Sequence, residues 1–426
     1  MRFNTLKEWL SWQETLHSKK IDLTLSRCQT VAKRLDLLNP DFPVITVGGT
    51  NGKGSSVTFL DSILIAAEYR TGRSTSPHLV HYNERICIAG KMVEDDALCQ
   101  AFAAIDEARQ NISLTYFEFN TLATLYLFKQ QKVDIAILEV GLGGRFDAAN
   151  IVDPTIALIT SIDLDHTDWL GDTREKIGFE KAGIFRPQQS AVCADPNPPK
   201  SVLNHAKQLG TILYCQNREF NYIKKEQTWQ WHSELQNYHD LPLPSLHGDF
   251  QLQNASGVLM ALNLLVQKGY PVSEKAIHYG LTHAQIAGRC QIIEGDITQI
   301  LDVTHNVAGA NALRENLEHY IKSGRVHAVV GMLKDKDIKN VFATLQDKID
   351  EWHVSPLDTA RSATKEQLVT TLQDLNITQY TAYSTILAAY NHALEQAEKG
   401  DYVIVFGSFY TVSAVLNQDL QTIEKT

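Results

Sequence analysis

Short apolar runs and longer helical patterns alternate along the first part of the chain. Strands are expected at 44–47, 135–140 and 155–162, because these runs are apolar at nearly every position. Apolar residues recur with helical spacing over 55–69 and 117–130. Strands without polar alternation are buried on both faces, which is typical of parallel sheets flanked by helices. The pattern therefore predicts a mainly parallel α/β domain.

The middle of the chain has a different character. Residues 190–246 carry P-N-P-P-K, a stretch rich in glutamine and tryptophan that includes Trp229 and Trp231, and L-P-L-P. This composition predicts short antiparallel strands and loops. Residues 254–267 return to a helical pattern.

A second α/β set begins near residue 287. Its expected strands are 297–303, 328–332, 351–354 and 402–406, with helices at 308–323, 339–349, 364–375 and 385–398. A set of about 140 residues can hold its own core. We therefore predict two domains, 1–286 and 287–426, with a hinge at 282–289 and no internal repeat.

Composition narrows the class of protein. The 426 residues carry a formal net charge of −10, which disfavours a nucleic-acid partner. Six cysteines are scattered without a C-x-x-C pair, as expected of small buried residues in a reducing compartment. We see no long apolar core in residues 1–20 and no apolar run long enough to span a membrane. A cytoplasmic protein without a membrane partner is expected.

A glycine-rich loop follows the first strand. Residues 45–56 read I-T-V-G-G-T-N-G-K-G-S-S. Such a loop between strand and helix can hold phosphate oxygens with backbone N–H groups, and the helix N-terminus adds a positive end. Lys53 would reach the β and γ phosphates, and Ser55 or Ser56 would place a hydroxyl on magnesium. The alternative is a βα turn that is merely rich in glycine. Val47 and Gly54 depart from the general phosphate-loop pattern.

Glu139 closes a second buried strand, in I-L-E-V-G-L-G-G-R-F-D-A-A-N. A buried carboxylate needs a partner, and magnesium beside a nucleotide is one candidate. A salt bridge with Arg145 is the other, and this motif alone does not choose between them.

A third strand is followed by S-I-D-L-D-H-T-D-W-L-G, residues 161–171. His166 lies there among Asp163, Asp165 and Asp168, which favour a cation. A lone histidine is more often structural than a metal ligand, whereas the neighbouring aspartates favour a ligand role. Both roles for His166 therefore stay open.

Lys181, in R-E-K-I-G-F-E-K-A-G-I-F-R-P, shows nothing unusual on composition alone. It would be a lysine near a helix C-terminus, stabilised by the helix dipole and capped by Gly183.

Several motifs occur in one order between residues 46 and 306. They read T-V-G-G-T-N-G-K-G-S, S-P-H-L…Y-N-E-R-I, Y-F-E-F-N-T-L-A, E-V-G-L-G-G-R-F-D-A-A-N, D-H-T-D-W-L-G, E-K-A-G-I-F-R, G-R and D-V-T-H-N. Together they resemble the bacterial dihydrofolate synthase / folylpolyglutamate synthase family, a relative of the Mur ligases. V-V-G-M-L-K-D-K-D and V-F-G-S-F, nearer the C-terminus, also fit that family.

The resemblance implies an ATP-dependent ligase that adds L-glutamate to dihydropteroate and to reduced folates. It implies a P-loop-type first domain for ATP and pterin or folate, a smaller Rossmann-like glutamate-ligase domain, and an ATP site at the interdomain cleft. The implied cofactors are ATP, Mg²⁺ at two sites, and a carbamate on Lys181. The partners would be small-molecule substrates, and the enzyme is expected to be a monomer.

The resemblance also implies roles for individual residues. ATP contacts would come from Thr50, Asn51, Gly52, Lys53, Gly54, Ser55, Asn254, Arg289 and Asp302. Metal ligands would be Ser76, Glu139 and His166. Catalytic roles fall to Lys53, Lys181 and His305, the last beside Asn306. The pterin or folate would contact Asp22, Thr115, Tyr116, Phe117, Glu118 and Phe146.

Two departures and two rivals accompany this interpretation. The family's P-G-R-F-Q reads A-G-R-C-Q here, and its H-N-P ends in Val307. Asp22 could instead be the N-cap of the helical pattern that follows it. A cell-wall Mur ligase would share the loop and the chemistry, and an NTPase switch or motor would share only the loop.

Overall fold

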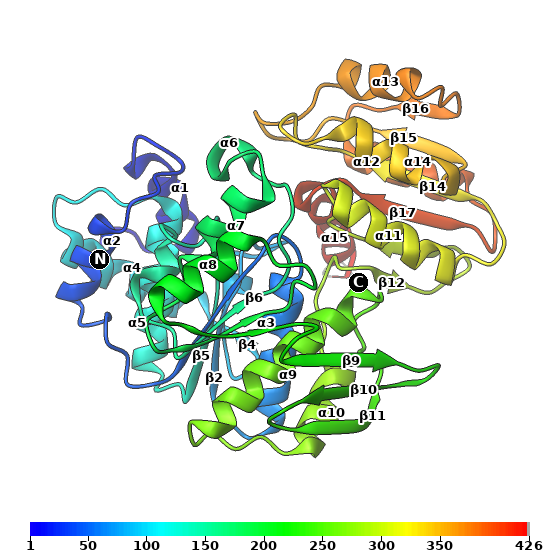
Figure 1. Cartoon of the computed structure of the whole chain (residues 1–426). Coiled ribbons are helices and arrows are strands. Elements are labelled where there is room, and N and C mark those ends of the chain that lie inside the picture. Colours follow the sequence, from blue (N-terminus) through cyan, green and yellow to red (C-terminus); the bar gives the residue numbers. More distant parts are fainter. Residues whose placement is uncertain (424–426) are drawn as a thin grey trace. The chain divides into compact units, whose positions relative to one another are not determined.

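A computed structural model describes residues 1–423 of the chain, with side chains as far as residue 418 (Figure 1). By its internal contacts the chain divides into two compact units. The first comprises residues 1–245 and 251–285, and the second comprises residues 246–250 and 286–426. Each unit is described by itself.

The first unit is built on a sheet with the order β4-β3-β2-β5-β1-β6-β7-β8 among the described residues. Its strands are β1 (Val44–Gly48), β2 (Thr71–Ser74), β3 (Ile86–Ile88), β4 (Lys91–Met92), β5 (Ile135–Glu139), β6 (Ile156–Ile159), β7 (Ser190–Cys193) and β8 (Ile212–Cys215). All neighbours from β2 to β8 in this order pair in parallel. Only β3 and β4, at one edge, run antiparallel to their neighbours. The predicted mainly parallel sheet is confirmed.

Helices cover both faces of this sheet. They are α1 (Leu6–Leu16), α2 (Ser26–Arg34), α3 (Lys53–Ala66), α4 (Asp95–Arg109), α5 (Tyr116–Gln130), α6 (Thr167–Leu170), α7 (Arg174–Ala182), α8 (Lys200–Leu209), α9 (Phe250–Gln267) and α10 (Glu274–His283). Single turns of 3₁₀-helix cover Tyr82–Arg85 and Ala148–Ile151. Every residue of β1, β5 and β6 is buried, as their continuous apolar character requires.

The prediction of antiparallel strands and loops for residues 190–246 is wrong in its first half. There β7 and β8 extend the parallel sheet, with α8 between them. The proline cluster lies in a short loop, residues 194–199, and its last member, Pro199, is the N-cap of α8. Antiparallel pairing is confined to β9 (Phe220–Lys224), β10 (Thr228–Ser233) and β11 (Asn237–Pro242). This small sheet lies beside α9 and α10 (Figure 1), and Trp231 Nε1 donates to the Ser256 carbonyl on α9 at 3.2 Å.

The second unit has a sheet with the order β12-β13-β17-β14-β15-β16 among the described residues. Its strands are β12 (Gln291–Ile293), β13 (Thr298–Leu301), β14 (Val326–Val330), β15 (Glu351–Val354), β16 (Tyr380–Ala382) and β17 (Tyr402–Phe406). Its helices are α11 (Val307–Tyr320), α12 (Ile338–Leu345), α13 (Lys365–Asp374), α14 (Ile386–Gln396) and α15 (Phe409–Ile423), with one 3₁₀ turn at Gln346–Lys348. All neighbours except β12 and β13 pair in parallel. The predicted second α/β set is confirmed, whereas the short strands β12 and β16 were not predicted.

The strand order brings three loops of the first unit together. β1 lies between β5 and β6, so the loops that follow these strands leave the same edge of the sheet. Ligands of parallel α/β sheets bind at that edge. The six cysteines are all buried and form no disulfide. None of the helices in residues 1–423 has the length and apolar character needed to cross a membrane.

Candidate active site

The glycine loop between β1 and α3 has a backbone that only glycine can adopt. Gly49 and Gly52 have φ values of +147° and +85°. A Cβ on Gly49 would lie 1.9 Å from Thr160 Oγ1, and a Cβ on Gly52 would lie 2.2 Å from Asn254 Oδ1. The two glycines therefore allow neighbouring side chains to approach the loop closely.

The loop is held in place by the segment that follows β6. Thr50 N donates to the Ser161 carbonyl at 2.6 Å, and Thr160 Oγ1 donates to the Asn51 carbonyl at 2.6 Å. Asp163 N donates to Thr50 Oγ1 at 3.0 Å. A loop fixed by these bonds is organised before any ligand binds, and α3 begins immediately after it at Lys53.

A polar pair on α9 reaches the same loop. Gln251 Nε2 donates to Ser55 Oγ at 3.3 Å, and Asn254 Nδ2 donates to Gln251 Oε1 at 2.9 Å. Asn254 and Ser55, both predicted from sequence, are therefore connected through Gln251, which the sequence did not single out.

Two lysine side chains meet at one carbonyl of the loop. Lys53 Nζ donates to the Gly49 and Thr50 carbonyls at 3.0 and 3.1 Å, and Lys181 Nζ donates to the Gly49 carbonyl at 2.8 Å. Burial, and after it the positive charge of Lys53, lower the pKa of Lys181 to about 7. Asp165 and Asp147 oppose the effect. Lys181 therefore carries a substantial neutral fraction near pH 7.

The predicted helix end at Lys181 is present, with Gly183 as the C-cap of α7, but it does not account for the burial of the lysine. Lys181 does lie in the last turn of α7, but it is buried, with 5 % of its surface exposed. Gly183 has φ −61°, so it does not form a left-handed cap. The side chain of Lys181 points at the glycine loop, where its Nζ donates to the Gly49 carbonyl.

Glu139 ends β5 in a buried position and is connected to Ser76. Ser76 N donates to Glu139 Oε2 at 2.9 Å. Arg145 is engaged elsewhere, since its Nη2 lies 2.6 Å from Glu180 Oε1. The alternative of a Glu139–Arg145 salt bridge is therefore wrong, and a carboxylate at this strand end is of a ligand type that suits a divalent cation.

His166 has an exposed side chain and a left-handed backbone, with φ +50°. Its N–H donates to Asp165 Oδ1 at 2.9 Å, and its Nε2 lies 3.7 Å from Asp165 Oδ2. It lines the same cavity as Ser76. Imidazole, hydroxyl and carboxylate groups thus occur at one edge of the sheet and could hold a divalent metal.

A cavity of about 270 Å³ lies at this edge. It is lined by Lys20, Ile21, Asp22, Leu23, Thr24, Ser76, Pro77, Arg85, Thr115, Phe117, Glu118, Gly141, Leu142, Phe146, Asp147, Ala148 and His166. Five of the six residues predicted to contact substrate are in this lining. The exception is Tyr116, whose ring packs 5.7 Å from Tyr82 and under the guanidinium of Arg85.

Asp22 enters the cavity as part of an ionic chain. Arg27 Nη1 donates to Asp22 Oδ2 at 3.0 Å, and Arg27 Nη2 donates to Glu118 Oε1 at 3.1 Å. His17 Nε2 lies 3.2 Å from Asp22 Oδ2. Burial alone would raise the pKa of Asp22, but His17, Arg27 and Lys19 together lower it. The carboxylate is therefore held ionised.

The alternative role of Asp22 as a helix N-cap is wrong. Helix α2 begins at Ser26, its N-cap is Leu25, and no side chain caps it. The real cap in this region is Thr115, which forms a capping box with Glu118 at the start of α5. Glu118 thus uses one oxygen for the box and the other for Arg27.

Aromatic rings supply the apolar part of the cavity. A Cβ on Gly141 would lie 2.6 Å from Phe117 Cζ, so the absence of a side chain lets this ring pack on the loop after β5. Phe146 is 41 % exposed, with the Arg145 guanidinium 4.4 Å from its ring centre. Flat apolar surface beside a carboxylate suits a planar heterocycle with N–H donors.

Two residues of this region were missed by the sequence reasoning. Arg27 resembles an ordinary charged helix residue, and only its neighbours reveal that it joins Asp22 to Glu118. Asp147 is buried and accepts from the N–H groups of Leu142 and Ala149, while burial raises its pKa to about 6. Asp147 follows three glycines in one motif, and this position could have identified it as a candidate site residue.

Of the predicted residues of the second unit, Asp302 and His305 follow β13, whereas Arg289 precedes β12. Asp302 accepts from Cys290 N at 2.7 Å and Thr304 N at 2.8 Å. The Arg289 guanidinium lies 5.4 Å from the ring centre of Phe409. The ring of His305 is 6.5 Å from the same phenyl ring.

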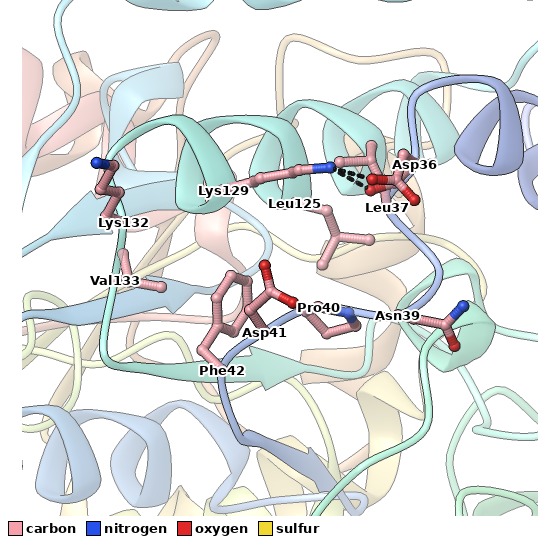
Figure 2. Close-up of a pocket in the computed structure, with 10 residues that line it drawn as sticks. All are labelled: Asp36, Leu37, Asn39, Pro40, Asp41, Phe42, Leu125, Lys129, Lys132 and Val133. Atoms are coloured by element: carbon pink, nitrogen blue, oxygen red, sulfur yellow. Dashed lines mark hydrogen bonds and ion pairs between the residues drawn. The ribbon is translucent and has the colours of Figure 1, made fainter.

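Another cavity of the first unit, of about 300 Å³, lies at the opposite edge of the sheet (Figure 2). Its walls come from residues 36–42, which precede β1, and from Lys132 and Val133, which precede β5. Lys129 reaches across to Asp36 at 2.7 Å. Because it lies at the amino ends of the strands, this cavity is not where a parallel sheet binds its substrate.

Comparison with known proteins places these features in a family. Residues 47–262 match the family model of the Mur ligase middle domain, and residues 288–409 match the model "Mur ligase, glutamate ligase domain". A dihydrofolate synthase/folylpolyglutamate synthase of Escherichia coli (strain K12) is 44 % identical over 411 residues, covering 96 % of this chain and 94 % of its own length. The protein of that name from Haemophilus influenzae is 44 % identical over 428 residues, covering 96 % of each chain.

Solved structures agree with the sequence match. E. coli FolC in complex with DHPP and ADP has a TM-score of 0.93 and 43 % identity, with 99 % of both chains covered. A bifunctional folylpolyglutamate synthase/dihydrofolate synthase with Mn, AMPPNP and L-glutamate bound has a TM-score of 0.90 and 43 % identity. The match covers 97 % of this chain and 98 % of that one.

Proposed function

The chain belongs to the dihydrofolate synthase/folylpolyglutamate synthase family of Mur ligases, and from this premise we propose how its residues carry out the family's reaction. It is an ATP-dependent ligase that adds L-glutamate to dihydropteroate and to the γ-carboxylate of reduced folates. ATP and a divalent metal take part. One observation carries the assignment of residues. A fixed phosphate loop and an aromatic cavity with an ionised carboxylate occur at the same edge of one sheet.

The reaction begins when the substrate carboxylate attacks the γ-phosphorus of ATP. ADP leaves with the bridging oxygen, and the carboxylate becomes an acyl phosphate. The amine of L-glutamate then attacks the acyl carbon and loses a proton. Collapse of the tetrahedral intermediate breaks the C–O bond and releases inorganic phosphate. No side-chain nucleophile is required, so the protein's task is to position the reactants and stabilise charge.

The phosphate loop supplies most of the ATP contacts in this proposal. Thr50 and Asn51 donate their backbone N–H groups to Ser161 after β6, so the shape of the loop that continues through Gly52 is fixed before ATP binds. The ammonium of Lys53 lies at the Gly49 carbonyl of this loop, and Gly54 and Ser55 belong to the first turn of α3. Asn254 reaches the loop from α9. Arg289, Asp302 and His305 of the second unit are proposed to complete the nucleotide and catalytic contacts.

Lys181 is proposed to carry a carbamate. Carbamylation requires a neutral amine that attacks CO₂, and the lowered pKa of Lys181 supplies one near pH 7. The product is an anion in place of a cation. Beside Lys53, that anion would find a positive partner, whereas two ammonium groups at one carbonyl repel each other.

The metal chemistry is proposed to centre on Ser76, Glu139 and His166, with the carbamate favouring a second ion. Their oxygen and imidazole donors fit a hard or borderline divalent cation. The bond from Ser76 N orients the Glu139 carboxylate. A bound metal would neutralise phosphate charge, and the chain's own residues would orient the phosphate group and exclude water.

The pterin end of the substrate is proposed to bind in the cavity. Asp22 would accept two N–H bonds from the amino-pyrimidine edge, and Phe117 or Phe146 would stack on the ring. Thr115 and Glu118 shape the wall through their capping box, and Glu118 keeps Arg27 beside Asp22. Tyr116 does not line the cavity, so it would support the cavity wall through its packing on Tyr82 and would not contact the pterin itself. The monomeric state and cytoplasmic location remain predictions.

Phosphate release separates this function from its rivals. Purified protein with Mg·ATP should release phosphate rapidly only when dihydropteroate and L-glutamate are both present. Rapid hydrolysis that ignores both substrates would point to an NTPase switch or motor. Activity with a UDP-sugar peptide and none with dihydropteroate would point to a cell-wall ligase.

A further inference from the structure

We propose that the second unit holds a divalent cation of the Zn²⁺ type between β14 and β15, ligated by His327, Glu351 and His353. This site lies outside the residues assigned to ligation, and the proposed function does not depend on it. Nothing in the sequence pattern pointed to it, because the ligands come from two strands that are distant in sequence.

The register of the sheet brings the three side chains to one face. β14 and β15 pair in parallel with His327 opposite Glu351. His353 is two residues beyond Glu351 and therefore points to the same face. One ligand atom from each of the three lies within 4.8 Å of the others.

The separations between these atoms suit a small tetrahedral ion. His327 Nδ1 lies 3.4 Å from His353 Nε2 and 3.7 Å from Glu351 Oε2. Two nitrogens that each lie about 2.0–2.1 Å from a tetrahedral Zn²⁺ are about 3.4 Å apart. The imidazole pair already has this spacing, and the carboxylate needs only a small shift.

One of the two histidines has a hydrogen-bond partner on its outer ring nitrogen. His353 Nδ1 lies 3.2 Å from the hydroxyl of Tyr383. Within the described residues, His327 Nε2 is buried without a hydrogen bond, and Asp401 Oδ2 lies 3.8 Å from it, beyond hydrogen-bond distance. Outer partners of this kind orient metal-bound imidazoles and select the tautomer that leaves the inner nitrogen free to bind. Tyr383 is therefore placed to orient His353, while the outer nitrogen of His327 has only the carboxylate of Asp401 nearby in the described part of the chain.

The charges around the cluster also favour a cation. His327 and His353 are both fully buried, so the ion would lie where water does not compete for the two imidazoles. Glu351 and Asp401 are carboxylates at the cluster, and Arg325 opposes them from the exposed side, 3.3 Å from Glu351 Oε2. Two imidazoles and one carboxylate select Zn²⁺ over Mg²⁺, which prefers oxygen ligands.

The position of the cluster indicates a structural role. Glu351 is the first residue of β15 and His327 the second of β14, so the ion would lie near the amino ends of these strands. Asp302 and His305 follow the carboxyl end of β13, at the other edge of this sheet. The ion would join β14 to β15 and take no part in ligation. Without an ion, the two imidazoles would share only their long hydrogen bond.

Metal titration of the full-length protein tests the proposal. After treatment with a chelator, Zn²⁺ is titrated without nucleotide against a chromophoric competitor, and the wild type is compared with Glu351→Gln and His353→Gln. Each substitution should weaken one Zn²⁺ site by about 100-fold or more, since loss of an outer partner already costs 10- to 100-fold. Tyr383→Phe should weaken the same site by about tenfold. Mg²⁺ in place of Zn²⁺ should not compete.

His319→Gln is the matched control, because it removes an exposed histidine of the same unit. It should leave Zn²⁺ binding unchanged. Circular dichroism checks each variant for folding. If His353→Gln fails to fold, Glu351→Gln decides, because its side chain is partly exposed. Equal Zn²⁺ affinity and stoichiometry in the wild type and the folded ligand variants would overturn the proposal.

Discussion

Replacing Lys181 by methionine should stabilise the protein at neutral pH while abolishing ligation. Methionine keeps the length of the side chain but removes an amine whose pKa burial lowers from 10.5 to about 7. That difference of about 3.5 in pKa corresponds to about 5 kcal/mol as an upper bound. About 1 kcal/mol is lost again with the hydrogen bond to the Gly49 carbonyl. A net gain of at most about 4 kcal/mol is expected at pH 7.

The gain should disappear as the pH rises. Unfolded Lys181 keeps its proton up to about pH 10, whereas the folded protein releases it near pH 7. Between these values the unfolded state binds more protons, so the wild type becomes more stable with increasing pH. The methionine variant has no such group. Its advantage should therefore be largest at pH 7 or below and close to zero at about pH 9.5.

Urea unfolding in CO₂-free buffer at about pH 7 and pH 9.5 measures this difference. Five of the six tryptophans lie in the first unit, so their fluorescence reports its transition. Lys176→Met is the matched control on α7, because that lysine is exposed and pairs with Asp172 at 2.9 Å. It should change stability by less than about 1 kcal/mol at both pH values. A Lys181→Met variant that is less stable at pH 7, or equally shifted at both pH values, would refute the reasoning.

Three further substitutions test the loop and the cavity. Lys53→Ala should leave the circular dichroism spectrum unchanged but reduce turnover by about 100-fold or more, as loss of a charge-stabilising donor does; near-normal turnover in the folded variant would remove Lys53 from the mechanism. Asp22→Ala should impair use of dihydropteroate far more than use of tetrahydrofolate, and an equal loss for both substrates would contradict a pterin contact. Gly52→Ala should weaken ATP binding measured by calorimetry and lower stability by about 1–2 kcal/mol, because alanine resists the left-handed backbone and meets Asn254; unchanged ATP affinity would show that the loop does not need this conformation.

Elements with strong apolar character were predictable from the sequence. Strands β1, β5 and β6 are buried on both faces, so their runs carry a clear signal. Strands β7 and β8 are only four residues long, and the helix between them begins directly after a proline. The sequence pattern therefore did not show that both strands belong to the parallel sheet. Strands β12 and β16 have three residues each and were missed for the same reason.

The candidate site was predictable where its residues follow a strand directly. The glycine loop, Glu139 and His166 stand in such positions, and the sheet order brings their loops to one edge. Arg27 was not predictable, because its role depends on Asp22 and Glu118 on two other segments. The lowered pKa of Lys181 likewise comes from burial and from Lys53, which no local pattern records.

Isotope transfer in the first ligation tests the central claim most directly. Dihydropteroate labelled with ¹⁸O in its carboxylate is incubated with the wild-type protein, Mg·ATP and L-glutamate, and the products are analysed by mass spectrometry. Ligation through an acyl phosphate should yield dihydrofolate and ADP, with one ¹⁸O in each phosphate released. Phosphate without the label, or no dihydrofolate at all, would contradict the account.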